Sequence, residues 1–114
     1  MGASSVYSLF QEALRRTRQD LRTPGPLIEQ DGACARFSLS RTGRRVLEAE
    51  YECTTCITLV ALCEYLRRTV VGLDLESVAA MVPRDLLASF PEIPKAKRAR
   101  AALAVRAIQA ACKS

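Results

Sequence analysis

A chain of 114 residues is long enough to bury a hydrophobic core without staples, so we expect a single domain over residues 1–114. The sequence contains no His, which removes the Ser–His and Cys–His nucleophile pairs and the commonest zinc ligand, and we therefore do not expect an enzyme. The net charge of +5 would suit a nucleic acid or an acidic protein surface, but the three Phe and three Tyr do not alternate with the basic clusters, so we do not expect nucleic acid as the partner.

No apolar run is long enough to span a bilayer, and the N-terminal stretch lacks the basic and apolar regions of a secretory signal. The sequence therefore predicts a cytoplasmic protein without a membrane partner. In that compartment the five cysteines stay mostly reduced, which favours metal or thiol chemistry over disulfides.

Apolar residues first recur at helical spacing, which predicts a helix over residues 5–21 with Ser4 or Ser5 as its N-cap, followed by a loop over residues 23–33. A β-hairpin comes next, because Phe37 and Leu39 alternate with polar residues and a turn follows at 41–44. On the return strand we expect one buried face and one wet face. The buried face would hold Leu47, Ala49, Tyr51 and Cys53, and the wet face Val46, Glu48, Glu50 and Glu52.

A long, widely apolar helix is predicted over residues 56–71, capped by Thr54 or Thr55 and closed by Gly72, with Glu64 and Arg67 as surface charges. Short helices should follow at 75–81, with Asp74 as N-cap, and from Pro83. An extended connector over 90–94 then leads to an Ala-rich helix over 95–113. This order predicts the α+β class, a small antiparallel sheet packed by helices.

Three of the five cysteines lie in the stretch YECTTCITLVALCEYL. Cys53 and Cys56 form a C-x-x-C pair at a predicted strand-to-helix junction, where the helix N-terminus favours a thiolate; alternatively, Cys53 belongs to the core. Cys63 lies about 10 Å further along the helix, by helix rise, and is expected in the core. Cys112, near the end of the last helix, is expected to have no role.

The pieces YECTTC, GLDLESVA, Ile93-Pro94 and AIQAA resemble, in this order, the iron–sulfur cluster assembly scaffold family, the IscU/NifU N-terminal fold that SufE shares. The resemblance implies a scaffold that holds a cluster or zinc with three Cys and an Asp. Cys56 matches the Cys at the start of the long helix, and Cys34 lies near the first Cys without its Gly-Asp. Ala99-Arg100-Ala101 replaces the His-Cys motif, and Lys97 matches the connector lysine.

We therefore expect an iron–sulfur cluster assembly scaffold-like protein that binds a cluster, a metal ion such as zinc, or a persulfide through Cys34, Cys53 and Cys56. Its partner would be a cysteine desulfurase or a cluster acceptor. A chain without a cofactor is equally expected, because the Asp and His-Cys ligands are missing. The alternative is a metal-free interaction or regulatory module that docks to an acidic partner through a basic face made of Arg15, Arg16, Arg18, Lys95, Lys97 and Arg98.

Overall fold

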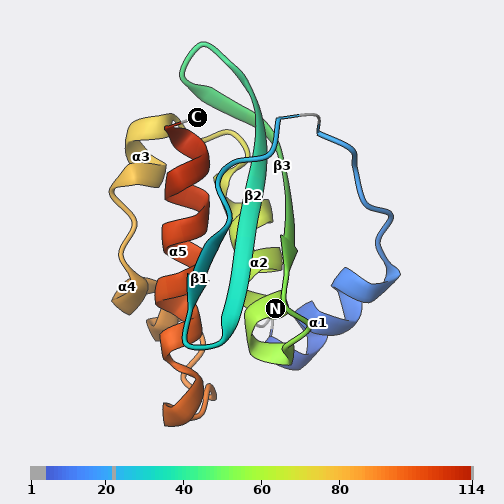
Figure 1. The fold of residues 1–114 in the computed structure, drawn as a ribbon, viewed down its shortest axis with the longest axis vertical. Helices are drawn as coiled ribbons and strands as arrows, with labels where there is room; N and C mark the ends of the chain where they lie inside the picture. Colours follow the sequence, from blue (N-terminus) through green and yellow to red (C-terminus); the bar gives the residue numbers. More distant parts are fainter. Residues whose placement is uncertain (1–4, 22, 114) are drawn as a thin grey trace.

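The computed structural model describes residues 5–21 and 23–113, and it confirms the α+β class (Figure 1). Ser4, one of the two expected N-caps, lies outside the described residues. In chain order the elements are α1 (Val6–Arg15), β1 (Ile28–Gln30), β2 (Ala33–Thr42), β3 (Arg45–Cys53), α2 (Ile57–Val70), α3 (Leu75–Ala79), α4 (Pro83–Ala88), the 3₁₀ turn η1 (Lys95–Lys97) and α5 (Ala99–Cys112).

The three strands form one antiparallel sheet in the order β1-β2-β3. Helices α2 and α5 pack against the same face of this sheet, α2 on β3 and α5 on β2, while α1 packs beside α2 (Figure 1). The sequence placed a loop where β1 pairs with β2 through Ile28 and Ala35. A strand of three residues is too short to show the alternation from which strands are predicted.

The buried layer lies between the sheet and the two long helices. Every second residue of β2 from Ala33 to Leu39 is buried, so this face of the strand is covered and the other is more open. The largest fully buried apolar side chains are Phe37, Leu9, Leu59, Leu62, Leu103 and Ile108.

The prediction of which β3 side chains are buried is wrong for the first residues of the strand. Val46 is fully buried, whereas Leu47 is 47% exposed. The register moves from Ser40 opposite Glu48 to Arg41 opposite Val46, so the strand carries a β-bulge at Leu47. A bulge adds one unpaired residue and reverses the alternation beyond it, which strict period-two counting cannot detect.

This bulge predicts unequal costs for two neighbouring truncations. Val46→Ala should lower the free energy of unfolding by about 2 kcal/mol, because it removes buried apolar volume. Leu47→Ala, its matched control, should change it by less than about 0.5 kcal/mol. Urea denaturation of both variants checks this, and a larger loss for Leu47→Ala would contradict the observed register.

The helix boundaries partly follow the prediction. Ser5 caps α1 in a capping box with Ser8, but the helix ends at Arg15 and not near residue 21. Asp74 caps α3 by accepting from the backbone N–H of Ser77, as expected. The helix predicted over 95–113 is divided into η1 and α5.

Helix α2 is closed by Gly72 as predicted, and this glycine has the left-handed conformation with φ +91°. Its other end differs from the prediction. The N-cap residue is Cys56, and the expected caps Thr54 and Thr55 lie before it. The hydroxyl of Thr54 is instead engaged with β2, which positions the site described next.

Candidate functional site

The strand-to-helix junction brings a cysteine to the first turn of a long helix. Strand β3 ends at Cys53, and α2 begins at Ile57. Cys56 holds the N-cap position with extended backbone angles (φ −135°, ψ 126°) and is half-buried. Its thiol therefore lies where the backbone N–H groups of a helix start have no helical partner.

The surroundings of Cys56 favour its thiolate. Burial on its own would raise the pKa of this thiol. The backbone N–H of Leu59, the guanidinium of Arg100, the backbone N–H of Thr58 and the charge of Lys97 together outweigh burial and lower the pKa below its ordinary value.

Arg100 lies in the stretch 99–101 that was expected from the sequence to replace the family's His-Cys motif. It lies in the first turn of α5, where one guanidinium nitrogen, Nη1, donates a 3.4 Å hydrogen bond to the backbone carbonyl of Asp31. Its Nε is buried and has no hydrogen-bond partner within the described part of the chain. The site thus contains a fixed positive charge with an unused donor, which suits an anionic group.

Cys34 is tied to the same junction through Thr54. The Thr54 hydroxyl lies 2.9 Å from the backbone N of Cys34 and 3.6 Å from its Sγ, and the Thr54 N–H donates to the Cys34 carbonyl at 3.0 Å. Sequence reasoning assigned Thr54 only a capping role, and no local pattern indicates its contact with residue 34.

Cys53 lies on the other side of the sheet from Cys34. It pairs with the buried Ala35, so its side chain lies on the face that the helices cover, whereas the side chain of Cys34 lies on the more open face. Contact with the thiol of Cys63 lowers the pKa of Cys53; burial opposes this shift and the charge of Arg18 adds to it. The C-x-x-C pair is therefore divided between two environments.

The donors present do not fit a metal ion held by three or four protein ligands. Among residues 5–21 and 23–113, no group of three or more Cys, Asp or Glu is placed to hold a metal ion. The sheet separates Cys34 from Cys53, and the guanidinium of Arg100 lowers the pKa of Cys56 from nearby. A tetrahedral metal or a cluster needs donors that converge on one point, and a fixed cation opposes a further cation there.

The thiol environments predict different labelling rates. At neutral pH, iodoacetamide should modify Cys56 faster than Cys112, another half-buried thiol, whose pKa is raised by burial. Arg100→Ala should slow the labelling of Cys56 roughly threefold, because the thiolate loses a neighbouring cation. Arg106→Ala is the matched control on the same helix, since Arg106 donates to Gln30 instead. Mass spectrometry of timed digests measures each rate, and equal slowing by both variants would contradict a role for Arg100.

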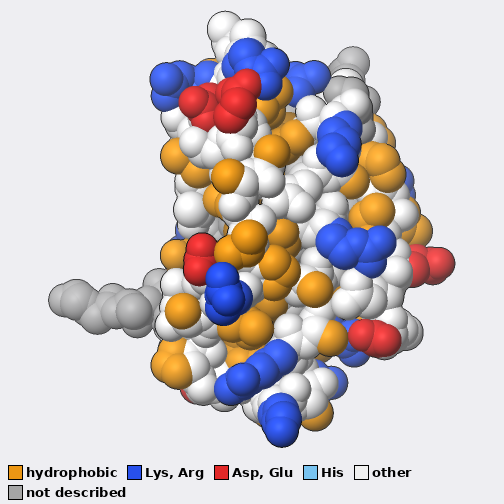
Figure 2. Space-filling model, turned by 90° about the vertical axis from the view of Figure 1, so that its left-hand side faces the viewer, with side chains coloured by type: hydrophobic (Ala, Val, Ile, Leu, Met, Phe, Trp, Pro, Cys, Tyr) orange, Lys and Arg blue, Asp and Glu red, His pale blue; other side chains and the backbone are white. Residues whose placement is uncertain are grey.

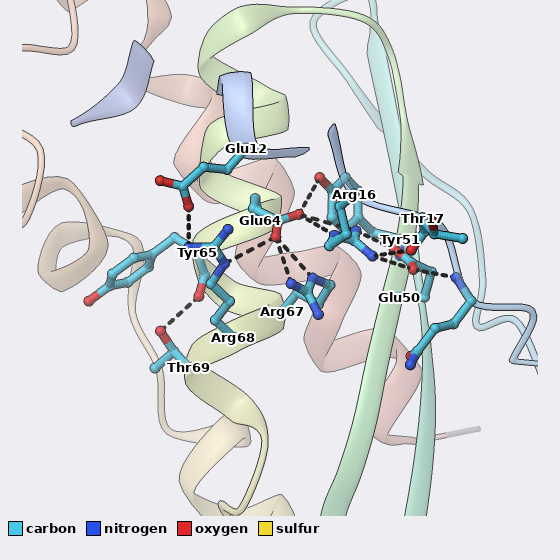
Figure 3. A network of polar contacts seen from close by, with 11 residues as sticks. Glu12, Arg16, Thr17, Glu50, Tyr51, Glu64, Tyr65, Arg67, Arg68 and Thr69 are labelled. Carbon is cyan, nitrogen blue, oxygen red and sulfur yellow. Dashed lines mark hydrogen bonds and ion pairs between the residues drawn. The ribbon is translucent and has the colours of Figure 1, made fainter. Parts of the chain in front are cut away.

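A network of charges, which the sequence treated as separate surface residues, lies on the side of α2 that faces α1 and β3 (Figure 3). Glu64 is fully buried, so its assignment as a surface charge is wrong. Its two carboxylate oxygens accept from Arg67 at 2.7 Å, Tyr51 at 2.9 Å, Arg68 at 3.1 Å and Arg16 at 3.2 Å. The donors come from β3, from α2 and from Arg16, the residue that follows α1, and the approach of these elements is not visible in the sequence.

Arg16 links this network to the sheet. Its two terminal nitrogens bind the two carboxylate oxygens of Glu50 at 2.7 Å each, and the backbone N–H of Gln19 donates to Glu50 at 2.8 Å. This pairing explains why α1 ends at Arg15 and why Glu50 is buried on a face expected to be wet. The expected basic face is corrected accordingly, because only 18% of the Arg16 side chain is exposed and it is paired within the fold.

Fold and site together define a small α+β protein built around a cysteine at the start of a long helix. The family model described as "NifU-like N terminal domain" matches residues 31–114, and the chain belongs to this family. Comparison with curated proteins finds no match. Family membership supports an iron–sulfur cluster assembly scaffold-like role; members are generally not enzymes and usually interact with proteins such as desulfurases.

Over the described ranges, none of the helices has the length and apolar character needed to cross a membrane.

Proposed function

We propose that this chain serves iron–sulfur cluster assembly by carrying sulfur as a persulfide on Cys56. The observation that carries the proposal is the half-buried Cys56 thiol at the first turn of α2, close enough to Arg100 and Lys97 for their charges to lower its pKa. A terminal persulfide sulfur is negatively charged at neutral pH, so the same cations and the helix N–H groups would stabilise it.

The transfer needs no external oxidant. The Cys56 thiolate attacks the outer sulfur of a donor persulfide on a cysteine desulfurase, and the donor S–S bond breaks. The outer sulfur is then bonded to Cys56, and the donor cysteine leaves as a thiolate that takes up a proton. Cys34, held to the junction by Thr54, is the second thiol of the proposed site.

The donor set favours persulfide over a resident metal. A persulfide needs one nucleophilic thiol and stabilising positive charge, and Cys56 with Arg100 and Lys97 meets this need. A zinc ion or cluster would require further ligands in place of the family's Asp and His-Cys motifs. Cys53, the third expected site residue, belongs to a different environment.

Incubation with a cysteine desulfurase and L-cysteine tests the proposal. Intact mass spectrometry without reductant should show a gain of one sulfur atom, and peptide mapping should locate it on Cys56. Cys56→Ser should abolish the gain, Arg100→Ala should reduce it, and Cys112→Ser should retain it. No gain, or a gain on another cysteine, would refute the proposal. Iron, zinc and sulfide analysis of the freshly purified protein tests the competing metal-bound form.

A second candidate function is docking to an acidic protein surface without sulfur transfer. Lys95, Lys97 and Arg98 are exposed in and after η1. Basic side chains also border an apolar area on the face over α3, α4 and α5 (Figure 2). In a pull-down with a desulfurase, the double variant Lys95→Glu/Arg98→Glu should lose the partner if this candidate holds, while Cys56→Ser keeps it. Retention by the charge-reversed variant would exclude docking through this cluster.

A further inference from the structure

An apolar groove opens to solvent between α1 and the start of α2, two helices that pack beside each other (Figure 1). The groove has a volume of about 320 Å³, and its lining includes Phe10, Leu14 and Val60. Leu14 is 68% exposed, and Ile57, almost one turn of α2 before Val60, is 48% exposed. Large apolar side chains that gather in water on two adjacent helices mark a surface that another molecule covers.

The apolar side chains of α1 that lie outside the core recur at helical spacing. Leu9 is buried and holds the helix on the core, whereas Tyr7 is exposed and Phe10 is only partly buried. Tyr7, Phe10 and Leu14 are three and four residues apart, so they follow one side of the helix. This is the a and d spacing by which one helix packs along another, so the stripe suits a helix of a partner molecule.

The rim of this groove is positively charged. Arg15 and Arg18 are both exposed, and Arg18 also forms part of the lining, with its guanidinium carbon 5.5 Å from the centre of the Tyr51 ring. Within residues 5–21 and 23–113, neither arginine has an ion-pair or hydrogen-bond partner. Arg16, the third arginine at the groove, is already paired with the carboxylates of the network described above. Carboxylates placed beside apolar side chains would complement this rim.

We propose that the groove is a docking site for an amphipathic helix of a partner protein, with apolar side chains on one face and Asp or Glu on its flanks. The apolar face packs along Tyr7, Phe10 and Leu14 and fills the groove, and the acidic flanks pair with Arg15 and Arg18. The stripe from Tyr7 to Leu14 extends over about 10 Å, roughly two turns of helix. A contact of this size belongs to a transient complex.

A second copy of this chain is the poorer occupant of the groove. Helix α1 of the copy would bring its own Arg15 and Arg18 to a rim that is already positive, and each chain carries a net charge of +5. Like charges brought together across an interface cost several kcal/mol and disfavour the wrong partner. The charge of the rim therefore selects an acidic partner over self-association.

Binding of a synthetic acidic helix to the full chain tests the proposal. The probe is a fluorescein-labelled peptide that forms an amphipathic helix, with leucines on one face and glutamates on both flanks. Its controls are a scrambled peptide of the same composition and a peptide with lysines in place of the glutamates. Fluorescence anisotropy should show saturable binding of the probe alone, and added salt should weaken it. Backbone amide shifts in NMR spectra should change in α1 and in the first turn of α2.

Removal of the central leucine should weaken this binding. Leu14→Ser should raise the Kd of the probe roughly tenfold, because the substitution removes an apolar anchor from the centre of the contact. Leu27→Ser is the matched control, since Leu27 is 50% exposed and lies outside the lining of the groove. The control should bind the probe as the unmodified chain does.

Reversal of the rim charges should weaken the binding as well. The double variant Arg15→Glu/Arg18→Glu should raise the Kd of the probe at least tenfold and remove the effect of salt. Lys95→Glu/Arg98→Glu makes the same change in net charge on exposed residues elsewhere in the chain, and it should retain binding.

The proposal would be overturned by an absence of saturable binding, by equal binding of a control peptide, or by equal weakening in a variant and its control. Amide shifts confined to α3, α4 and α5 would also overturn it. A dimer in sedimentation that dissociates in Leu14→Ser would assign the groove to a second copy instead. Thermal melting identifies any variant that fails to fold, and the amide shifts of the unmodified chain need no variant. The probe carries no sulfur donor, so its binding and persulfide formation on Cys56 are measured independently.

Discussion

Replacing Glu64 by Gln should lower the free energy of unfolding by about 3 kcal/mol at neutral pH. Glu64 is fully buried and accepts from three arginines and one tyrosine, so the amide would lose the charge and leave donors of the network without an acceptor. Removing one member of a buried ion pair typically costs about 3–5 kcal/mol. We expect a cost at the lower end of this range, because the arginine side chains reach the surface and can be hydrated again.

The same carboxylate predicts a pH dependence. Burial on its own would raise its pKa, but Arg67, Tyr51 and Arg16 lower it from 4.5 to about 2. The folded-state pKa is thus below the unfolded one, so the stabilisation is fully present above about pH 4.5 and is lost as the pH falls through about 2. The loss across this window should be about 3 kcal/mol, and Glu64→Gln should remove most of that dependence.

Glu52→Gln is the matched control for this prediction. Glu52 pairs with Arg36 at 3.0 Å, but 64% of its side chain is exposed. The control should cost less than about 1 kcal/mol, because an exposed pair gains little over hydrated ions. Urea titrations from pH 7 to pH 2 measure both variants. An equal cost for the two substitutions, or an unchanged acid slope in Glu64→Gln, would contradict the central position of Glu64.

Gly25→Ala should lower the free energy of unfolding by about 3 kcal/mol. A Cβ at this position would lie 2.8 Å from the Cα of Ala111 and 2.9 Å from the carbonyl oxygen of Phe37. Both atoms are backbone, held by α5 and by β2, and Gly25 itself donates to Phe37 at 2.8 Å. Neither neighbour can move without separating the helix from the sheet, so the overpacking cost should reach the upper part of its usual range of about 1–3 kcal/mol.

Gly32→Ala is the control for the Gly25 substitution. A Cβ at Gly32 would meet nothing within 4 Å, and its only cost is the left-handed backbone conformation with φ +78°. That cost should be about 1 kcal/mol. Adding Ala111→Gly to Gly25→Ala should rescue only part of the loss, since the contact with the Ala111 Cα remains. Thermal and urea unfolding measure the loss of stability in each variant. A larger loss for Gly32→Ala than for Gly25→Ala would exclude close packing at Gly25.

The sequence predicts the elements that repeat a simple pattern over many residues. The alternation around Phe37 and the apolar positions of α2 are enough for the β2–β3 hairpin and the long helix, and local chemistry at Ser5, Asp74 and Gly72 predicts three of the helix ends. The errors arise where contacts distant in the sequence decide the structure. The bulge at Leu47, the short strand β1 and the early end of α1 each depend on a partner residue elsewhere in the chain.

In the candidate site, too, the sequence predicts the local features and misses those that depend on contacts between residues distant in the chain. The resemblance identifies Cys56 at a helix start, and the structure places it there. The link between Cys34 and Thr54 arises from the pairing of β2 with β3, and the effect of Cys63 on the pKa of Cys53 arises from the packing of α2 on β3. Residue spacing favoured Cys53 with Cys56, because three positions are close along the chain whatever the fold.

The pairing of Arg16 and Gln19 with Glu50 has a consequence for self-association. Strand β3 is the last strand of its sheet. Its first residues are hydrogen-bonded to the segment after α2, through Val46 and Leu73, and within the described residues no strand pairs with the rest of that edge. Such an edge is a template on which another polypeptide can add a strand and begin to aggregate. Arg16 binds both Glu50, on the more open face of β3, and Glu64, on the helix that covers the other face, so its side chain passes over this edge of the strand. We therefore expect this ion pair to hinder edge-to-edge aggregation of the sheet as well as to fix the end of α1.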